Sequence, residues 1–118
     1  MATLTPTLTL VSAAGQVSSD AMSVSVTDEL SVTKDIITLS KIQLSTGDLT
    51  LHATSYTKSY LYFKNMDSSI NITVSFGSTV SLELGALEFA FFPWSGASAI
   101  VVAAASGTPF LEYALFEA

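Results

Sequence analysis

Residues 60–65 read YLYFKN and residues 87–92 read LEFAFF, and these two runs decide the fold class. Apolar residues stand at successive positions in both, so both faces of an extended strand would be hydrophobic. Strands of this kind are expected where a sheet is covered on each side. The two runs therefore predict central strands that form the core of a β-sheet protein.

The rest of the chain alternates apolar and polar residues in short runs, and helix signals are nearly absent. Turn sequences separate the runs, as in STGD at 45–48 and MDSS at 66–69. PWSGAS at 93–98 and SGTP at 106–109 join the last three runs into what resembles a meander of hairpins. Eight to ten short strands at this spacing suit a two-sheet sandwich or a small barrel. We predict an all-β, antiparallel β-sandwich of the jelly-roll or Ig-like type.

The length of 118 residues suits one domain, and no linker is evident, so residues 1–118 are expected to form a single β-sandwich domain. Residues 1–59 are weakly hydrophobic and Ser/Thr-faced, which predicts outer strands or an N-terminal arm, and residues 60–118 predict the core strands. Pro6 restricts its run to an edge strand or an extended arm. Asp28 and Glu29 break the next alternation and predict a turn or a bulge.

Charged residues make up only 12% of the chain, against about 25% in an ordinary domain, while 49% of the residues are hydrophobic. Polar cover comes instead from 18 Ser and 14 Thr. The net charge is −6, with four lysines and no basic residue after Lys64. Nucleic acid is therefore not an expected partner, because phosphate binding needs a basic surface. The acidic second half would suit a basic protein surface, or the charge serves solubility alone.

The sequence also argues against secretion and against a membrane span. MATLTPTLTL at 1–10 lacks the basic start and the continuous apolar run of a signal peptide. Residues 89–105 are uncharged, but Pro93 and Gly96 interrupt them, and they are short for a spanning helix. With no cysteine, neither a disulfide nor a thiolate metal site is expected, which suits synthesis in a reducing cytoplasm.

No set of residues predicts an enzyme, so we expect no catalytic, cofactor-binding or metal-binding residue and no cofactor. Nucleophilic hydrolysis needs a base, and the single histidine, His52, reads as a strand-surface residue in LTLHA. Oxygen ligands stand at Asp28 and Glu29 and around Asp67, but without the spacing of a calcium loop. Turn capping explains these acids more simply.

The aromatic residues predict an assembly surface. Trp94 stands between Pro93 and Ser95 at an expected hairpin tip, where it either contacts a partner or folds back to plug the sandwich. INITVSF at 70–76 and AIVVAAA at 99–105 combine high β-propensity with no charge, and neighbouring subunits would cover them. The candidate assembly interface comprises Tyr60, Tyr62, Phe92, Trp94, Phe110 and Phe116.

Three stretches carry a resemblance to a known class of protein. They are YLYFKNMDSSINITV at 60–74, LGALEFAFFPWSG at 84–96 and SGTPFLEYALFE at 106–117. Together they resemble small β-sandwich virion structural proteins of tailed bacteriophages, of the capsid decoration (cement) or tail-appendage type. The resemblance covers about half of the chain and consists of strand rhythm and hairpin composition. It implies a domain that forms oligomers, commonly trimers.

The function that we expect is that of a non-enzymatic virion structural protein, a capsid decoration or cement protein that stabilises the phage head by binding between capsid subunits. Its partners would be further copies of itself and the major capsid protein or another virion protein, on the capsid surface. One alternative is a tail or fibre component. Another is a carbohydrate-binding β-sandwich for host attachment, with Trp94, Tyr56, Tyr60 and Tyr62 as stacking platforms.

Overall fold

The computed structural model describes residues 2–12, 22–53 and 57–118, and within these ranges it contains twelve β-strands and no helix. The predicted all-β class is confirmed. The chain divides into two compact units, Met1–Val32 and Thr33–Ala118. The division lies well before residue 59, where the outer strands or arm were expected to end, because Ile37 and Ile42 already pack against the core.

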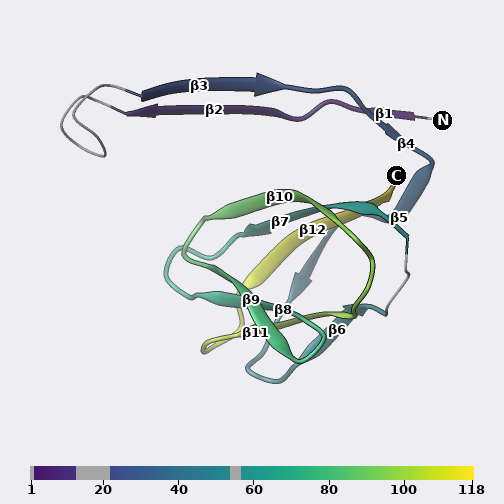
Figure 1. The fold of residues 1–118 in the computed structure, drawn as a ribbon. Helices are drawn as coiled ribbons and strands as arrows, with labels where there is room; N and C mark the ends of the chain where they lie inside the picture. Colours follow the sequence, from purple (N-terminus) through teal and green to yellow (C-terminus); the bar gives the residue numbers. More distant parts are fainter. Residues whose placement is uncertain (1, 13–21, 54–56) are drawn as a thin grey trace. The chain divides into compact units, whose positions relative to one another are not determined.

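The first unit contains two antiparallel strand pairs, which together we call the N-terminal ribbon (Figure 1). Its strands are β1 (Ala2–Leu4), β2 (Thr7–Ser12), β3 (Met22–Thr27) and β4 (Leu30–Val32), with β1 paired to β4 and β2 to β3. The ladder is interrupted where the sequence predicted a break. The Asp28 amide donates to the Pro6 carbonyl (3.2 Å), and Asp28 Oδ1 accepts a hydrogen bond from the Glu29 amide (2.8 Å).

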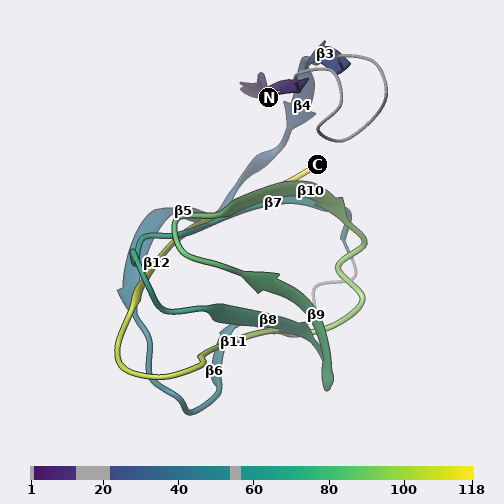
Figure 2. The same cartoon turned by 90° about the vertical axis from the view of Figure 1, so that its left-hand side faces the viewer.

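The second unit is an antiparallel β-sandwich of two four-stranded sheets, and Figure 2 shows the sheets as separate layers. One sheet has the order β10-β7-β12-β5 and the other the order β6-β11-β8-β9. The bounds are β5 (Lys34–Gln43), β6 (Leu49–His52), β7 (Ser59–Asn65), β8 (Ile72–Phe76), β9 (Thr79–Leu84), β10 (Phe89–Trp94), β11 (Ile100–Ala104) and β12 (Phe110–Glu117). The predicted antiparallel sandwich is therefore confirmed.

The core lies between the two sheets and follows the period of two. Leu61 and Phe63 point inward from β7, and Ile72 and Val74 point inward from β8, each with 1% or less of its surface exposed. The other buried members of the core cluster are Leu44, Leu84, Trp94, Ile100, Val102, Ala104, Leu111 and Leu115. Burial of these side chains is the main stabilising contribution to the sandwich.

The two runs that predicted central strands have different places in the sheet. YLYFKN lies in β7, between β10 and β12, and is central as predicted. LEFAFF lies largely in β10, which is an edge strand, and Phe89 at its start is 64% exposed. The prediction for LEFAFF was wrong because aromatic residues on its second face do not belong to the core between the sheets.

The two uncharged runs that were expected to need neighbouring subunits are protected by the fold itself. INITVSF forms β8 and AIVVAAA forms β11, and these strands pair with each other and with β9 and β6 on their other sides. Their backbone groups are thus satisfied within the sheet. An argument for assembly has to rest on other surfaces.

A buried asparagine organises the turn between β7 and β8. Asn65 Nδ2 donates to the carbonyls of Ile70 (2.7 Å), Leu84 (3.1 Å) and Gly85 (3.0 Å), and its Oδ1 accepts from the Asp67 amide (2.9 Å). None of the Asn65 surface is exposed. Its side chain therefore joins this turn to the end of β9.

Asp67 caps the same turn, as the sequence predicted. Its Oδ1 accepts hydrogen bonds from the amides of Ser69 (2.8 Å) and Ile70 (2.9 Å). These bonds favour the charged form and hold the pKa of Asp67 below its usual value.

Candidate functional site

The six aromatic residues of the predicted interface separate onto two faces of one sheet. Leu61 and Phe63 of β7 are core residues, so Tyr60 and Tyr62 point outward. Phe110 and Phe116 alternate with the inward Leu111 and Leu115 of β12 and also point outward. The remaining two, Phe92 and Trp94, belong to the core. The structure thus brings four of the six residues to the outer side of the β10-β7-β12-β5 sheet, where Phe110 is exposed, Tyr62 and Phe116 are half-buried and Tyr60 is buried, at 9% exposed.

Trp94 is the last residue of β10 and is only 9% exposed. Its ring centroid lies 5.8 Å from that of Phe76, and Phe92 meets the same Phe76 ring edge-on at 6.0 Å. Trp94 therefore closes the core, which is the second of the two roles that the sequence allowed. Trp94 lies on the opposite face of the sheet from Tyr60 and Tyr62, so these three residues do not form one stacking surface for a carbohydrate. Tyr56 lies outside the described residues.

The outward residues form rows across the sheet. The strand register aligns Pro93, Tyr60 and Phe116 in one row and Phe91, Tyr62 and Ala114 in the next. The rings of Tyr60 and Phe91 stack with centroids 6.3 Å apart and an interplanar angle of 15°. Lys58 Nζ lies 5.6 Å from the centroid of the Tyr60 ring, within the range of a cation–π contact. We call these two rows, with Phe89 and Phe110, the outer aromatic face.

A row with three charged residues crosses this face between Phe110 and the two aromatic rows, where Phe89, Lys64, Glu112 and Lys41 follow one another across the four strands. The Tyr62 hydroxyl donates to Glu112 Oε1 at 2.7 Å. Burial, the hydrogen bond to Glu112 and the Glu112 charge raise the pKa of Tyr62 to about 12. Tyr62 is therefore neutral at physiological pH, and it engages the one carboxylate in this row.

Two exposed residues of this region were missing from the predicted interface. Phe89 is 64% exposed, and Leu87, in the turn before β10, is 56% exposed. Leu87 has a positive φ of 61°, a conformation that costs a residue with a Cβ about 1–2 kcal/mol. The alternation within LEFAFF could have separated Phe89 from the inward Ala90 and Phe92, but nothing in the sequence indicates the backbone strain at Leu87. Strain of this kind often accompanies a functional surface.

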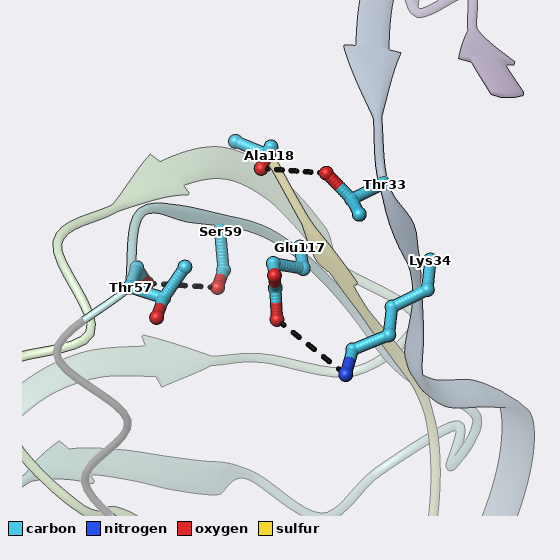
Figure 3. A network of polar contacts seen from close by, with 6 residues as sticks. All are labelled: Thr33, Lys34, Thr57, Ser59, Glu117 and Ala118. Atoms are coloured by element: carbon cyan, nitrogen blue, oxygen red, sulfur yellow. Dashed lines mark hydrogen bonds and ion pairs between the residues drawn. The ribbon is translucent and has the colours of Figure 1, made fainter. Parts of the chain in front are cut away.

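At one end of the sandwich the last residues of the chain are fixed between two strands (Figure 3). The Thr33 amide donates to the Glu117 carbonyl (2.8 Å), and Thr33 Oγ1 donates to the Ala118 carbonyl (3.1 Å). On the other side, the Ala118 amide donates to the Lys58 carbonyl (2.9 Å). Lys34 Nζ lies 4.0 Å from Glu117 Oε2, an exposed ion pair of small energetic value. Thr33, where the sandwich begins, is thus tied directly to β12.

His52 lines an open hollow of about 390 Å³ beside this end. The other lining residues are Lys34, Asp35, Ile36, Thr57 and Glu117. His52 Nε2 is shielded from solvent and has no hydrogen-bond partner within the described chain. In the described ranges no three His, Cys, Asp or Glu side chains are grouped so that they could hold a metal ion.

Comparison of the chain with protein-family models, with curated proteins and with solved structures finds no match. Among the residues that the structure describes, no helix has the length and apolarity needed to cross a membrane.

Proposed function

We propose that this chain is a non-enzymatic virion structural protein, a capsid decoration or cement protein that stabilises a phage head by binding between capsid subunits. The observation that carries the proposal is the outer aromatic face with its exposed Phe89 and Phe110, 64% and 45% exposed. Large apolar side chains that are exposed on one side of a folded domain are candidates for contact with other proteins. Aromatic residues are the type most enriched at such interfaces.

The composition of the chain supports an adhesive role. With 12% charged residues, much of the protein surface is uncharged, and contact with another subunit need desolvate few charged groups. The charged row ends in Lys41, and an acid, Glu112, lies between Lys41 and Lys64. A partner surface that carries both apolar and charged groups fits this arrangement.

The strand order supports the jelly-roll type of sandwich over the Ig-like type. Consecutive strands from β5 to β12 lie in opposite sheets, except for the hairpin β8–β9. Eight strands in two Greek keys make a jelly roll, an architecture common in viral capsid proteins but also found in lectins and enzymes. The fold therefore agrees with a virion role by analogy, and the outer aromatic face supplies the specific argument.

Mass spectrometry of purified phage particles, with copy number, tests the proposal. Hundreds of copies per particle are expected for a decoration protein. A handful of copies would favour the tail or fibre component instead. Absence of the chain from particles would refute a virion role.

Paired variants test whether the outer aromatic face is the attachment surface. Phe89→Asp should reduce binding of the purified protein to particles that lack it, because it places a charge in the contact. Thr79→Asp makes the same charge change at an exposed position of β9, in the other sheet, and should bind normally. Equal binding by both variants would show that attachment does not use this face.

Leu87→Gly separates attachment from stability. Glycine tolerates the positive φ at this position, so the free energy of unfolding should not fall, although the chain loses an exposed apolar side chain. We expect weaker particle binding by a variant at least as stable as the native chain. Unchanged binding would exclude Leu87 from the contact.

A further inference from the structure

The lysines of the chain are gathered on one side of the sandwich. Lys64 and Lys41 stand in the charged row that crosses the outer aromatic face, and Lys58 places its Nζ over the Tyr60 ring at one end of that face. Only Lys34, of the four lysines in the sequence, lies elsewhere, at the hollow that His52 lines. The outer aromatic face therefore collects most of the positive charge of a chain whose net charge is −6.

Two carboxylates accompany these three lysines. Glu112 stands in the charged row, and Asp35 lies opposite Phe116 on the edge strand β5. Three lysines and two carboxylates give this side of the sheet a formal charge of +1, so the rest of the chain carries −7. Glu112 already accepts the hydrogen bond of the Tyr62 hydroxyl (2.7 Å). This side is thus the positive side of an acidic protein.

None of these three lysines is held in a direct ion pair. In the part of the chain that the structure describes, Lys41, Lys58 and Lys64 have no carboxylate oxygen within 4.0 Å, whereas Lys34 Nζ reaches Glu117 Oε2 at that distance. Lys41 and Lys58 are exposed, and Lys64 is half-buried. Their charges are therefore available to a partner.

An open hollow of about 490 Å³ adjoins the outer aromatic face at its Pro93 end. Its described lining consists of Lys58, Pro93, Trp94 and Ser95. The Ser95 hydroxyl oxygen accepts a hydrogen bond from the Ala97 amide (3.4 Å), and the hydroxyl hydrogen has no acceptor among the described residues. The hollow thus offers a carboxylate one charged donor and one hydroxyl donor, with apolar walls for the carbon chain that carries it.

We propose that the outer aromatic face binds an acidic surface of a different protein, and that a carboxylate side chain of that protein sits in the hollow beside Lys58. Apolar side chains of the partner would cover the two aromatic rows, and its acids would face Lys64 and Lys41. This inference rests on the proposed function, since it names the chemistry of the capsid surface that the face recognises. The sequence alone suggested a basic partner for the acidic second half. Of the five acids after Lys64, however, only Glu112 stands in a row of this face.

Charge argues against two other occupants of this face. The same face of a second copy would bring lysines against lysines, which charge complementarity disfavours. A nucleic acid needs a basic stripe that neutralises several phosphates, and this face has a formal charge of only +1. An acidic protein surface satisfies both the unpaired lysines and the apolar rows between them.

Binding of charge-reversed variants to particles that lack the chain tests the position of the charge. Lys58→Glu and Lys34→Glu both change the net charge from −6 to −8, and both lysines are exposed, but only Lys58 belongs to the proposed contact. Lys58→Glu should weaken binding at least about tenfold, whereas Lys34→Glu should change it less than about threefold. Circular dichroism checks that both variants retain the β-fold. Equal binding by the two variants would overturn the proposal.

A peptide probe tests the same contact without particles. In nuclear magnetic resonance titrations of the full, nitrogen-15-labelled chain at low salt, hexaglutamate should shift the amide signals of Lys58, Tyr60 and Lys64 most. These shifts should disappear in about 0.5 M NaCl, because salt screens exposed charges. Hexalysine should leave the three signals in place. If hexaglutamate moved none of them, or hexalysine moved the same ones, the proposal would be wrong.

These outcomes are distinct from failure of the proposed function. A chain that is absent from particles but binds hexaglutamate at this face would refute the virion role and leave the acidic contact standing. A chain present in hundreds of copies whose Lys58→Glu and Lys34→Glu variants bind particles equally would do the reverse. Self-association of the native chain in sedimentation, abolished by Lys58→Glu, would overturn the assignment to a different protein, because the acidic side of a second copy would then be the occupant.

Discussion

Replacement of Asn65 by alanine should be among the most destabilising polar substitutions in the sandwich. The Asn65 side chain has no exposed surface, and its amide holds the turn after β7 to the end of β9. Alanine cannot supply these bonds, and water has no access to replace them. The change therefore acts on buried polar groups, whose desolvation is costly when a partner is lost.

The hydrogen bonds of Asn65 give the size of the effect. Its amide group carries two hydrogens, which serve three carbonyl oxygens, and its Oδ1 accepts one backbone N–H from Asp67. Three full hydrogen bonds at about 1 kcal/mol each give a loss of about 3 kcal/mol. For a unit of this size, that loss corresponds to a fall in Tm of about 15 °C.

Thermal and chemical unfolding followed by circular dichroism would measure this loss. Asn71→Ala is the matched control, because Asn71 is exposed and its Nδ2 donates only to Glu83 Oε1 (2.9 Å), so its loss should stay within about 0.5 kcal/mol. If Asn65→Ala cost no more than Asn71→Ala, the reasoning from buried hydrogen bonds would be refuted.

Three further predictions concern titration and turns. The Tyr62 hydroxyl should ionise at about pH 12. The unfolded chain loses this proton first, so the free energy of unfolding should fall between pH 10 and pH 12. Denaturant titrations of Tyr62→Phe across that range should lack this fall in the free energy of unfolding. Asp67 has a lowered pKa, so its stabilising effect is present at neutral pH and is lost as the pH falls through that lowered value. Acid unfolding of Asp67→Asn, which keeps an acceptor but cannot titrate, should lack this loss. Gly107→Ala and Gly77→Ala should each cost about 1–2 kcal/mol in thermal unfolding, because both sites have positive φ. A Cβ at Gly107 would lie 2.9 Å from the end of the Ile70 side chain, which can move, so this contact should add little to the cost.

Predictions from the sequence were correct where apolar and polar residues alternate along a strand and only one face of that strand is buried. It gave the all-β class and the sandwich, the central place of YLYFKN, the capping role of Asp67 and the break at Asp28 and Glu29. Each of these follows from local chemistry, either the period of two or the hydrogen bonds of a short turn. The predictions of a virion role, of no enzymatic activity and of particular partners stay predictions.

Features that depend on contacts between strands distant in the sequence could not be predicted. LEFAFF was expected in the sheet centre because hydrophobicity does not distinguish burial in a core from exposure at an intermolecular surface. Trp94 was expected at a hairpin tip. In the structure it is the last inward residue of β10, a position that is set by pairing with Ser59 of β7, and the sequence does not show this pairing. The boundary between Val32 and Thr33 was missed because 1–32 and 33–59 have the same Ser/Thr-faced pattern.

The link between Thr33 and the end of β12 determines how the sandwich responds to mechanical force. Tension carried by the N-terminal ribbon enters the sandwich at Thr33, the residue before β5, and β5 is paired with β12 at seven positions. A pull along the axis of β5 loads these pairs in shear, so that they resist together. A pull across the sheet would open them one after another from the Thr33–Glu117 bond. The direction of the pull relative to the axis of β5 therefore determines how much force the sandwich withstands.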